Sequence, residues 1–163
     1  MVSIALTIAG SDSGGGAGIQ ADLKSFSALG VYGASVITAV TAQNTKTVSA
    51  VHAIPTPMVE AQIKMVLEDL DVKAIKIGML ATAEIIAAVA GALRGFIGPV
   101  VLDPVMVAKS GAALLYESAV SALPPSPVPR ATVRSPTFPQ TRTRLRALPG
   151  SSPHDCLPLG SPL

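Results

Sequence analysis

Aromatic residues, cysteine and histidine are scarce in this chain of 163 residues. Aromatic side chains make up 3% of it, tryptophan is absent, and Cys156 is the single cysteine. One cysteine excludes an intramolecular disulfide and a zinc site built from several thiolates, and it is compatible with a reducing compartment. The two histidines, His52 and His154, are too far apart in the chain to indicate a metal site. The core must therefore be built from Ala, Val, Ile and Leu.

Charged residues are also few, at 13%, whereas apolar residues reach 49%. This composition excludes a chain that is disordered throughout. Residues 1–123 carry 7 basic and 9 acidic side chains, whereas residues 124–163 carry 5 basic and 1 acidic. The positive excess therefore belongs to the C-terminal segment, and no basic pattern interleaved with aromatic residues indicates DNA or RNA binding. We expect no nucleic-acid partner.

No segment is typical of a targeting signal or a membrane helix. The first residues, MVSIALTIAGSD, are apolar but lack a basic start, and Asp12 interrupts them early. The longest uncharged run, residues 25–45, contains glycines and several polar residues, and it divides into a helix end, a turn and a strand. We expect a cytoplasmic protein with no membrane partner.

Apolar runs alternate with helical patterns along the first 123 residues. Short continuous apolar runs, typical of strands buried on both faces, predict strands at residues 3–9, 35–41, 48–54, 74–78 and 100–102. Apolar residues at three- and four-residue spacing predict helices over residues 19–29, from Pro57 to about Leu70, and over residues 84–93. This alternation predicts an α/β fold, a mostly parallel sheet with helices on both faces.

The composition changes near residue 124. Ten of the forty residues from 124 to 163 are proline, and the segment has five arginines and no lysine. Because proline blocks helices and central strands, we expect this Pro/Ser/Arg-rich tail to be irregular or disordered. We therefore divide the chain into residues 1–123 and residues 124–163.

The segment GSDSGGGAG, residues 10–18, lies between the first expected strand and the first expected helix. Glycines before a helix allow an anion to approach the backbone N–H groups. The segment lacks the Gly-Lys-Ser/Thr of a Walker A loop, and Ile19 stands where a GxGxxG motif needs its third glycine. A ligand-binding loop and a tight structural turn both remain open.

Candidates for a site follow the expected strands. Gln43 and Asn44 end one strand, Met79 follows the IKIG strand, and Asp103 follows VVL. Open α/β sheets bind ligands at the carboxyl ends of their strands, where an Asp often holds a metal or orients a phosphate. Amides at such ends commonly cap a turn, however, and Met79 is normally a core residue. Asp22, in the first helix, is typical of a helix-dipole partner or a solvated residue.

Three motifs follow one another along the first part of the chain. They are ALTIAGSDSGGGAGIQADLKSFSALGVYGASVITAVTAQNT at residues 5–45, IKIGML at residues 75–80 and VVLDPVMVAKSG at residues 100–111. Together they resemble the hydroxymethylpyrimidine/phosphomethylpyrimidine kinases of thiamine biosynthesis. The resemblance implies a ribokinase-like α/β enzyme that uses ATP and Mg²⁺ to phosphorylate 4-amino-5-hydroxymethyl-2-methylpyrimidine and its monophosphate. Pyridoxal-type kinases share this fold and remain an alternative.

The resemblance also implies roles for single residues. Gln43 would pair with the polar edge of the pyrimidine, since a flat aminopyrimidine needs a donor and an acceptor on one edge and an amide supplies both. Asp103 and Lys109 would lie toward the phosphates and their metal. No catalytic residue is identified. The full set of pyrimidine-binding residues that the resemblance implies is Gly10, Asp22, Gln43, Met79 and Val105.

The C-terminal segment departs from the family pattern. SPTFPQ at residues 135–140 stands where the family has a TPNLPE-like segment, and the family's glycine-rich GTG loop is absent from the sequence. We therefore expect a truncated, N-terminal portion of such a kinase with impaired turnover. A reading-frame shift near residue 124 would account for the unusual tail. A non-catalytic fragment that only binds the pyrimidine is the other alternative, and a homodimer is compatible with the resemblance.

Overall fold

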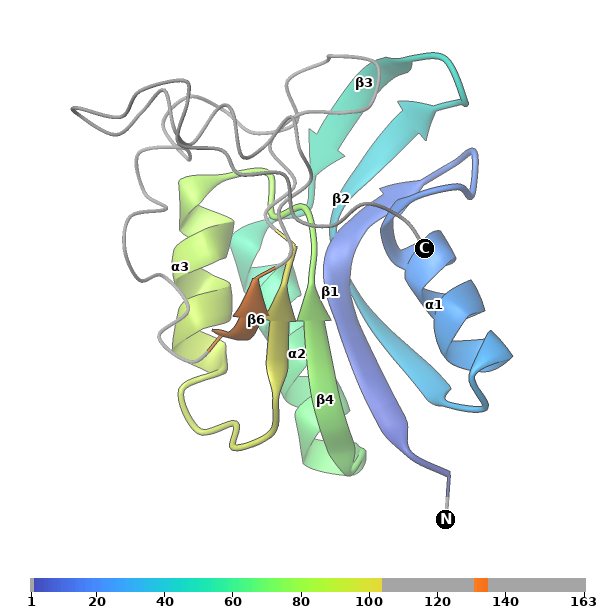
Figure 1. Cartoon of the computed structure of the whole chain (residues 1–163). Helices are drawn as coiled ribbons and strands as arrows, with labels where there is room; N and C mark the ends of the chain where they lie inside the picture. Colours follow the sequence, from blue (N-terminus) through green and yellow to red (C-terminus); the bar gives the residue numbers. More distant parts are fainter. Residues whose placement is uncertain (1, 104–130, 135–163) are drawn as a thin grey trace, which may run out of the picture.

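The computed structural model describes residues 2–103 and the backbone of residues 131–134. Within these residues the chain forms a sheet of six strands in the order β3-β2-β1-β4-β5-β6, as Figure 1 shows. The elements follow one another as β1 (Ile4–Asp12), α1 (Gly18–Ala28), β2 (Tyr32–Gln43), β3 (Val48–Ala53), α2 (Thr56–Asp69), β4 (Val72–Ile77), α3 (Ala83–Ala92), β5 (Val100–Leu102) and β6 (Ala131–Arg134).

Four of the five strand pairings are parallel. β1 pairs in parallel with β2 on one side and β4 on the other, and β5 pairs in parallel with β4 and β6. Only β3, which follows β2 through a short turn, is antiparallel to its neighbour. The carboxyl ends of β2, β1, β4 and β5 therefore lie along one edge of the sheet. The prediction of a mostly parallel sheet is confirmed.

Helices cover both faces of the sheet, also as predicted. Helices α2 and α3 lie on one face and α1 on the other (Figure 1). Leu6 and Ile8 of β1 are fully buried in the core with side chains of α2 and α3. Each such side chain contributes about 1.5–3 kcal/mol through burial. On the other face Gly33 of β2 lies directly against Leu23 and Phe26 of α1.

The described helices have 11, 14 and 10 residues, and the starts of α2 and α3 follow local sequence signals. Pro57 lies in the first turn of α2, as predicted. Thr82 caps α3, because its hydroxyl accepts a hydrogen bond from the Ile85 N–H at 3.2 Å. Within the part of the chain that the structure describes, no helix has the length and apolar character needed to cross a membrane.

β1 is longer than its apolar run. The prediction ended this strand at residue 9, before the glycines, but pairing with β2 resumes with Ser11 opposite Val40 and Asp12 opposite Thr41. The register shifts between Ala9 and Ser11, so Gly10 lies at an irregularity of the kind that glycine permits. The prediction missed this extension because it depends on the partner strand.

One strand lies in the C-terminal segment that we expected to be irregular. Ala131–Arg134 form β6, which pairs with β5 at the edge of the described sheet. These four residues contain no proline, and their edge position respects the constraint that proline places on the segment. The predicted site residues Val105 and Lys109 lie outside the described residues, and the division of the chain at residue 123 stays a prediction.

The connection from β1 to α1 approaches β1 closely. Gly15 and Gly18 have φ angles of +73° and +57°, a backbone conformation that favours glycine. A Cβ atom on Gly18 would also collide with the carbonyl oxygen of Gly10. Two separate constraints therefore require glycine at position 18.

Gly18→Ala should lower the free energy of unfolding more than a change that only strains the backbone. Gly30→Ala tests the backbone alone, since Gly30 has φ of +70° and a Cβ added there would meet no atom within 4 Å, and it should cost roughly 1 kcal/mol. Gly95→Ala, where neither constraint applies, should change stability by less than about 0.5 kcal/mol. Urea unfolding of the three variants measures the order. Equal losses for Gly18→Ala and Gly30→Ala would contradict the role of the Gly10 contact.

Candidate functional site

Asp12 ends β1, and its carboxylate holds the glycine-rich segment in place. Its Oδ1 accepts a hydrogen bond from the Gly14 N–H at 2.8 Å. Its Oδ2 accepts from the N–H groups of Gly16 and Ala17 at 3.0 and 2.8 Å. Asp12 is only 5% exposed. Backbone donors that could receive an external anion are thus bound to an internal carboxylate, which favours the tight structural turn over the ligand-binding loop.

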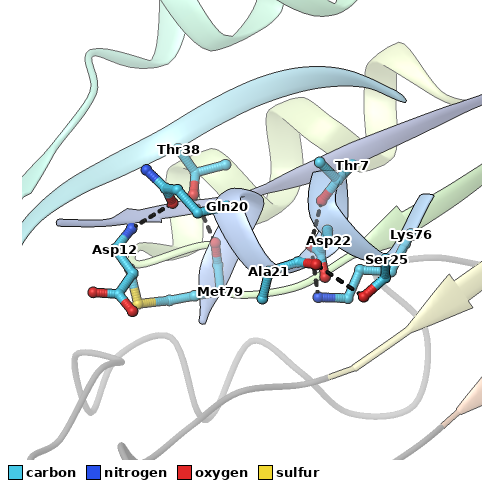
Figure 2. Close-up of polar contacts among 9 residues, drawn as sticks. All are labelled: Thr7, Asp12, Gln20, Ala21, Asp22, Ser25, Thr38, Lys76 and Met79. Atoms are coloured by element: carbon cyan, nitrogen blue, oxygen red, sulfur yellow. Dashed lines mark hydrogen bonds and ion pairs between the residues drawn. The ribbon is translucent and has the colours of Figure 1, made fainter. Parts of the chain in front are cut away.

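Helix α1 fixes the end of β1 from the other side. Gln20 Oε1 accepts from the Asp12 N–H at 2.8 Å (Figure 2). Gln20 Nε2 donates to Ser11 Oγ at 2.7 Å. Lys24 Nζ donates to the Gly15 carbonyl at 2.7 Å. The first turns of α1 therefore hold both the strand end and the loop, so the edge of the sheet is rigid at this point.

Gln43 lies at the carboxyl end of β2, beside this loop. Its backbone N–H and carbonyl both bond to the Ser13 hydroxyl at 2.8 Å. Its side-chain Oε1 accepts from Thr41 Oγ1 at 3.3 Å, and Nε2 donates to no described residue. Gln43, Asp12 and Lys46 help to line an open hollow of about 270 Å³ between the glycine segment and the β2–β3 turn. The amide is therefore placed with its donor available.

Asn44 caps a turn, as amides at strand ends commonly do. Its Oδ1 accepts from the N–H groups of Lys46 and Thr47, both at 2.9 Å. Asn44 thus caps the β2–β3 turn, whereas Gln43 next to it does not.

Gly10 and Met79 are in contact. A Cβ on Gly10 would lie 2.5 Å from Met79 Cε, so any larger residue would displace this methionine. Met79 is 7% exposed and packs with Ala39 and Ala81 in a small cluster separate from the main core. Its carbonyl accepts from the buried Thr38 hydroxyl at 2.6 Å (Figure 2). The methionine is therefore held as an apolar surface at the edge where β1, β2 and β4 end.

Asp22 lies beyond the first turn of α1 and is largely buried. The sequence-based interpretation of Asp22 as a helix-dipole partner or a solvated residue is therefore wrong. Its Oδ2 accepts a hydrogen bond from Thr7 Oγ1 at 2.6 Å and forms an ion pair with Lys76 Nζ at 3.0 Å (Figure 2). The side chains of Lys76 and Asp22 are 24% and 16% exposed. No hydrogen bond or ion pair among the described residues joins Asp22 to Gln43, so the two predicted polar residues belong to separate groups.

Asp103 follows β5 and is the least satisfied acidic residue of the described part. Its N–H donates to the Ile77 carbonyl at 2.8 Å, but its Oδ1 is buried and has no hydrogen-bond partner there. Burial raises the pKa of the Asp103 carboxyl; Lys76 lowers this pKa and Asp22 raises it. Asp103 therefore shares the electrostatic environment of the Asp22–Lys76 pair.

Sequence reasoning missed three residues of these groups. Asp12 precedes three glycines, and its side chain binds backbone N–H groups a few residues later, as Asp often does in turns. Lys76 interrupts an apolar strand between Ile75 and Ile77, which signals a partner because an unpaired lysine is costly there. Thr7 carries no comparable signal.

The fold defines a class of protein, the α/β domains whose parallel strands bring their carboxyl ends to one edge of the sheet. The family model described as phosphomethylpyrimidine kinase matches residues 12–152, and the chain belongs to this family. The hydroxymethylpyrimidine/phosphomethylpyrimidine kinase of Rhizobium meliloti is 62% identical over 138 residues, 85% of this chain and 52% of the relative. The Escherichia coli protein of the same name is 51% identical over 88% of this chain and 54% of its own length. The chain spans about half the length of the curated relatives it matches.

Solved structures agree with the ribokinase-like fold that the resemblance implied. The phosphomethylpyrimidine kinase of Clostridium difficile is 48% identical with a TM-score of 0.79, over 86% of this chain and 62% of that one. The pyridoxal kinase of Staphylococcus aureus in complex with AMP-PCP and pyridoxal is 34% identical with a TM-score of 0.75, over 90% and 52% of the two chains. Sequence identity is thus higher to the pyrimidine kinase.

Asp103→Asn should stabilise the chain at neutral pH. Folding raises the pKa of Asp103, so folding favours the protonated carboxyl. The resulting contribution to the free energy of unfolding is fully present below the ordinary aspartate pKa of about 4, and it is lost as the pH rises through the higher pKa of the folded state. Urea midpoints measured between pH 4 and 8 should show an advantage of the variant that grows with pH. Asp71→Asn, which removes only an exposed ion pair with Lys73, is the control. An advantage independent of pH would contradict this assignment.

Proposed function

We propose that this chain serves the ATP-dependent phosphorylation of the hydroxymethyl oxygen of 4-amino-5-hydroxymethyl-2-methylpyrimidine and of its monophosphate. The described residues would form the acceptor side of that reaction. The observation that carries the proposal is the contact between Gly10 and Met79, at the edge where Gln43 also lies. High identity to kinases named for these substrates supports it.

Gln43 would recognise the polar edge of the ring. Its Nε2 makes no bond to a described residue, and its Oε1 has only a long bond from Thr41, at 3.3 Å. An amide with both groups available can donate to a ring nitrogen and accept from an amino group. The two bonds between its backbone and the Ser13 hydroxyl hold the backbone of Gln43 at the end of β2, from which the side chain would reach the ring.

Gly10 and Met79 would supply the apolar contacts. The absence of a side chain at position 10 leaves room for the thioether of Met79, which would offer a polarisable surface to a flat ring. Val105 would complete the apolar wall, and Asp22 would meet a polar atom of the ring. Val105 is a proposal from the family resemblance alone, since it lies outside the described residues.

Asp103 would lie toward the phosphates and Mg²⁺, with Lys109. Within the described residues no three His, Cys, Asp or Glu side chains gather as they would around a metal ion. A single carboxylate nevertheless fits Mg²⁺, which kinases bind largely through substrate phosphates and water. The Oδ1 of Asp103, which has no hydrogen-bond partner among the described residues, is such an oxygen. When bound, the ion would neutralise charge on the phosphates.

The contribution of the described residues to the reaction is positioning. Phosphoryl transfer needs the acceptor oxygen in line with the γ-phosphoryl group, and holding the two together removes a large entropic part of the barrier. The ring contacts of Gln43 and Met79 would fix the orientation of the hydroxymethyl group. No covalent bond between enzyme and substrate is required.

A pyridoxal-type kinase is the second candidate, because pyridoxal kinases of Staphylococcus aureus share the fold with TM-scores of 0.70–0.75. Isothermal titration calorimetry of the chain, once with the aminopyrimidine and once with pyridoxal, distinguishes the two candidates by their affinities. Tighter binding of pyridoxal would contradict the pyrimidine assignment. Incubation with ATP, Mg²⁺ and the aminopyrimidine then separates a kinase from a fragment that only binds, by the appearance of the monophosphate.

Three further parts of the proposal rest on the resemblance. The reaction would take place in the cytoplasm, and the active form would be a homodimer, which light scattering of the purified chain tests.

Residues 1–123 would be the N-terminal part of the kinase domain, and residues 124–163 would follow a reading-frame shift. Resequencing the gene and translating it in all three frames tests this division. A continuous frame with no kinase-like alternative would contradict it.

Gln43→Ala should weaken binding of the aminopyrimidine by about 1–3 kcal/mol, since it removes a hydrogen-bonding group and leaves ligand atoms unpaired. Lys64→Ala is the control, because Lys64 is exposed on α2 and, within the described part of the chain, pairs only with Glu68. Isothermal titration of both variants measures the difference. Equal affinities would remove Gln43 from the site.

A further inference from the structure

Lys76 lies within β4 on the face that α1 covers. It stands opposite Thr7 in the parallel register of β1 and β4, and Asp22 reaches both from α1. Its neighbours Ile75 and Ile77 are buried in the main core on the opposite face. Three elements therefore place one hydroxyl, one ammonium and one carboxylate together (Figure 2).

The two oxygens of Asp22 are used unequally. Oδ2 receives both the Thr7 hydroxyl at 2.6 Å and the Lys76 ammonium at 3.0 Å. Oδ1 receives no hydrogen bond or ion pair from any residue that the structure describes. A carboxylate can accept about four hydrogen bonds, so the second oxygen keeps its capacity while the first fixes the group. This is the arrangement of an acceptor that is already oriented before a ligand arrives.

The group lies close to the proposed ring site. A Cβ on Gly78 would lie 3.1 Å from Lys76 Nζ, and Gly78 immediately precedes Met79. Met79 in turn contacts Gly10. The ammonium is therefore adjacent to the backbone that carries the proposed apolar wall.

We propose that Lys76, together with Thr7, is a positioning residue that holds Asp22 with Oδ1 directed to the exocyclic amino group of the aminopyrimidine. The inference rests on the proposed function and adds to it the determinant that selects rings with an amino group. An anionic acceptor forms a stronger hydrogen bond to an N–H donor than a neutral one. It also disfavours ring analogues that lack the donor, because its desolvated oxygen then stays unpaired.

Selectivity between two ligands tests this role better than affinity alone. Calorimetry compares 4-amino-5-hydroxymethyl-2-methylpyrimidine with 5-hydroxymethyl-2-methylpyrimidine, which lacks the amino group, on the full chain. The unmodified chain should prefer the amino ring, and Lys76→Met should reduce that preference by about tenfold. Lys76→Arg, which keeps the charge, should retain most of the preference. Lys73→Met removes an exposed lysine from the same strand and should change nothing.

Thr7→Val keeps the inference testable if Lys76→Met does not fold. It removes the hydroxyl donor to Asp22 at nearly constant volume, and it should reduce the preference by about fivefold. A lysine that only ties α1 to the sheet would weaken both ligands equally. If Lys76→Met folds and its preference for the amino ring is unchanged, the inference is overturned while the proposed function stands. If Lys76→Met does not fold, an unchanged preference in Thr7→Val overturns the inference in the same way. If the unmodified chain binds neither ring, the proposed function fails and the inference fails with it.

Discussion

The parallel pairing of β1 with both β2 and β4 is the constraint on which the rest of the structure depends. A strand bonded on both edges and covered on both faces cannot use its own backbone to bind a ligand except where it ends. Its side chains alternate between the two faces of the sheet: Leu6 and Ile8 fill the core on one face, whereas Thr7 faces α1 on the other and donates a hydrogen bond to Asp22. Because β2 and β4 run in the same direction as β1, the carboxyl ends of these three strands meet at one edge. That edge is where Gly10, Gln43 and Met79 lie.

Much of this arrangement could be predicted from the sequence, because strands buried on both faces are read as continuous apolar runs. The order of strands and helices, and the carboxyl-end positions of Gln43 and Asp103, follow from those runs. The extension of β1 beyond Gly10 does not, since it depends on hydrogen bonds to Val40 and Thr41 some thirty residues later. β6 was missed for a related reason: the proline content of its segment outweighed four residues that pair with β5.

The site was predictable to the extent that its partners are local. Asp12 bonds to N–H groups two, four and five residues later, so an Asp before several glycines carried a signal that could have been used. Asp22 and Lys76 are 54 residues apart, and neither position alone indicates the other. The glycine segment illustrates the local case: its composition permits an anion site, but Asp12, within the segment itself, already occupies the backbone donors.

Two carboxylates lie in the electrostatic environment of the Lys76 ammonium, and among the described residues they are satisfied unequally. Asp22 takes the direct ion pair with Lys76 and a hydroxyl bond, whereas Asp103 keeps a buried oxygen with no partner among the described residues and a raised pKa. The two acids therefore suit different tasks. Asp22 is fixed before a ligand binds, as an acceptor for a neutral N–H donor must be if it is to select among similar rings. Burial raises the pKa of Asp103, and a nearby cation would offset the cost of its buried charge, so Asp103 would suit the charged end of the reaction proposed here.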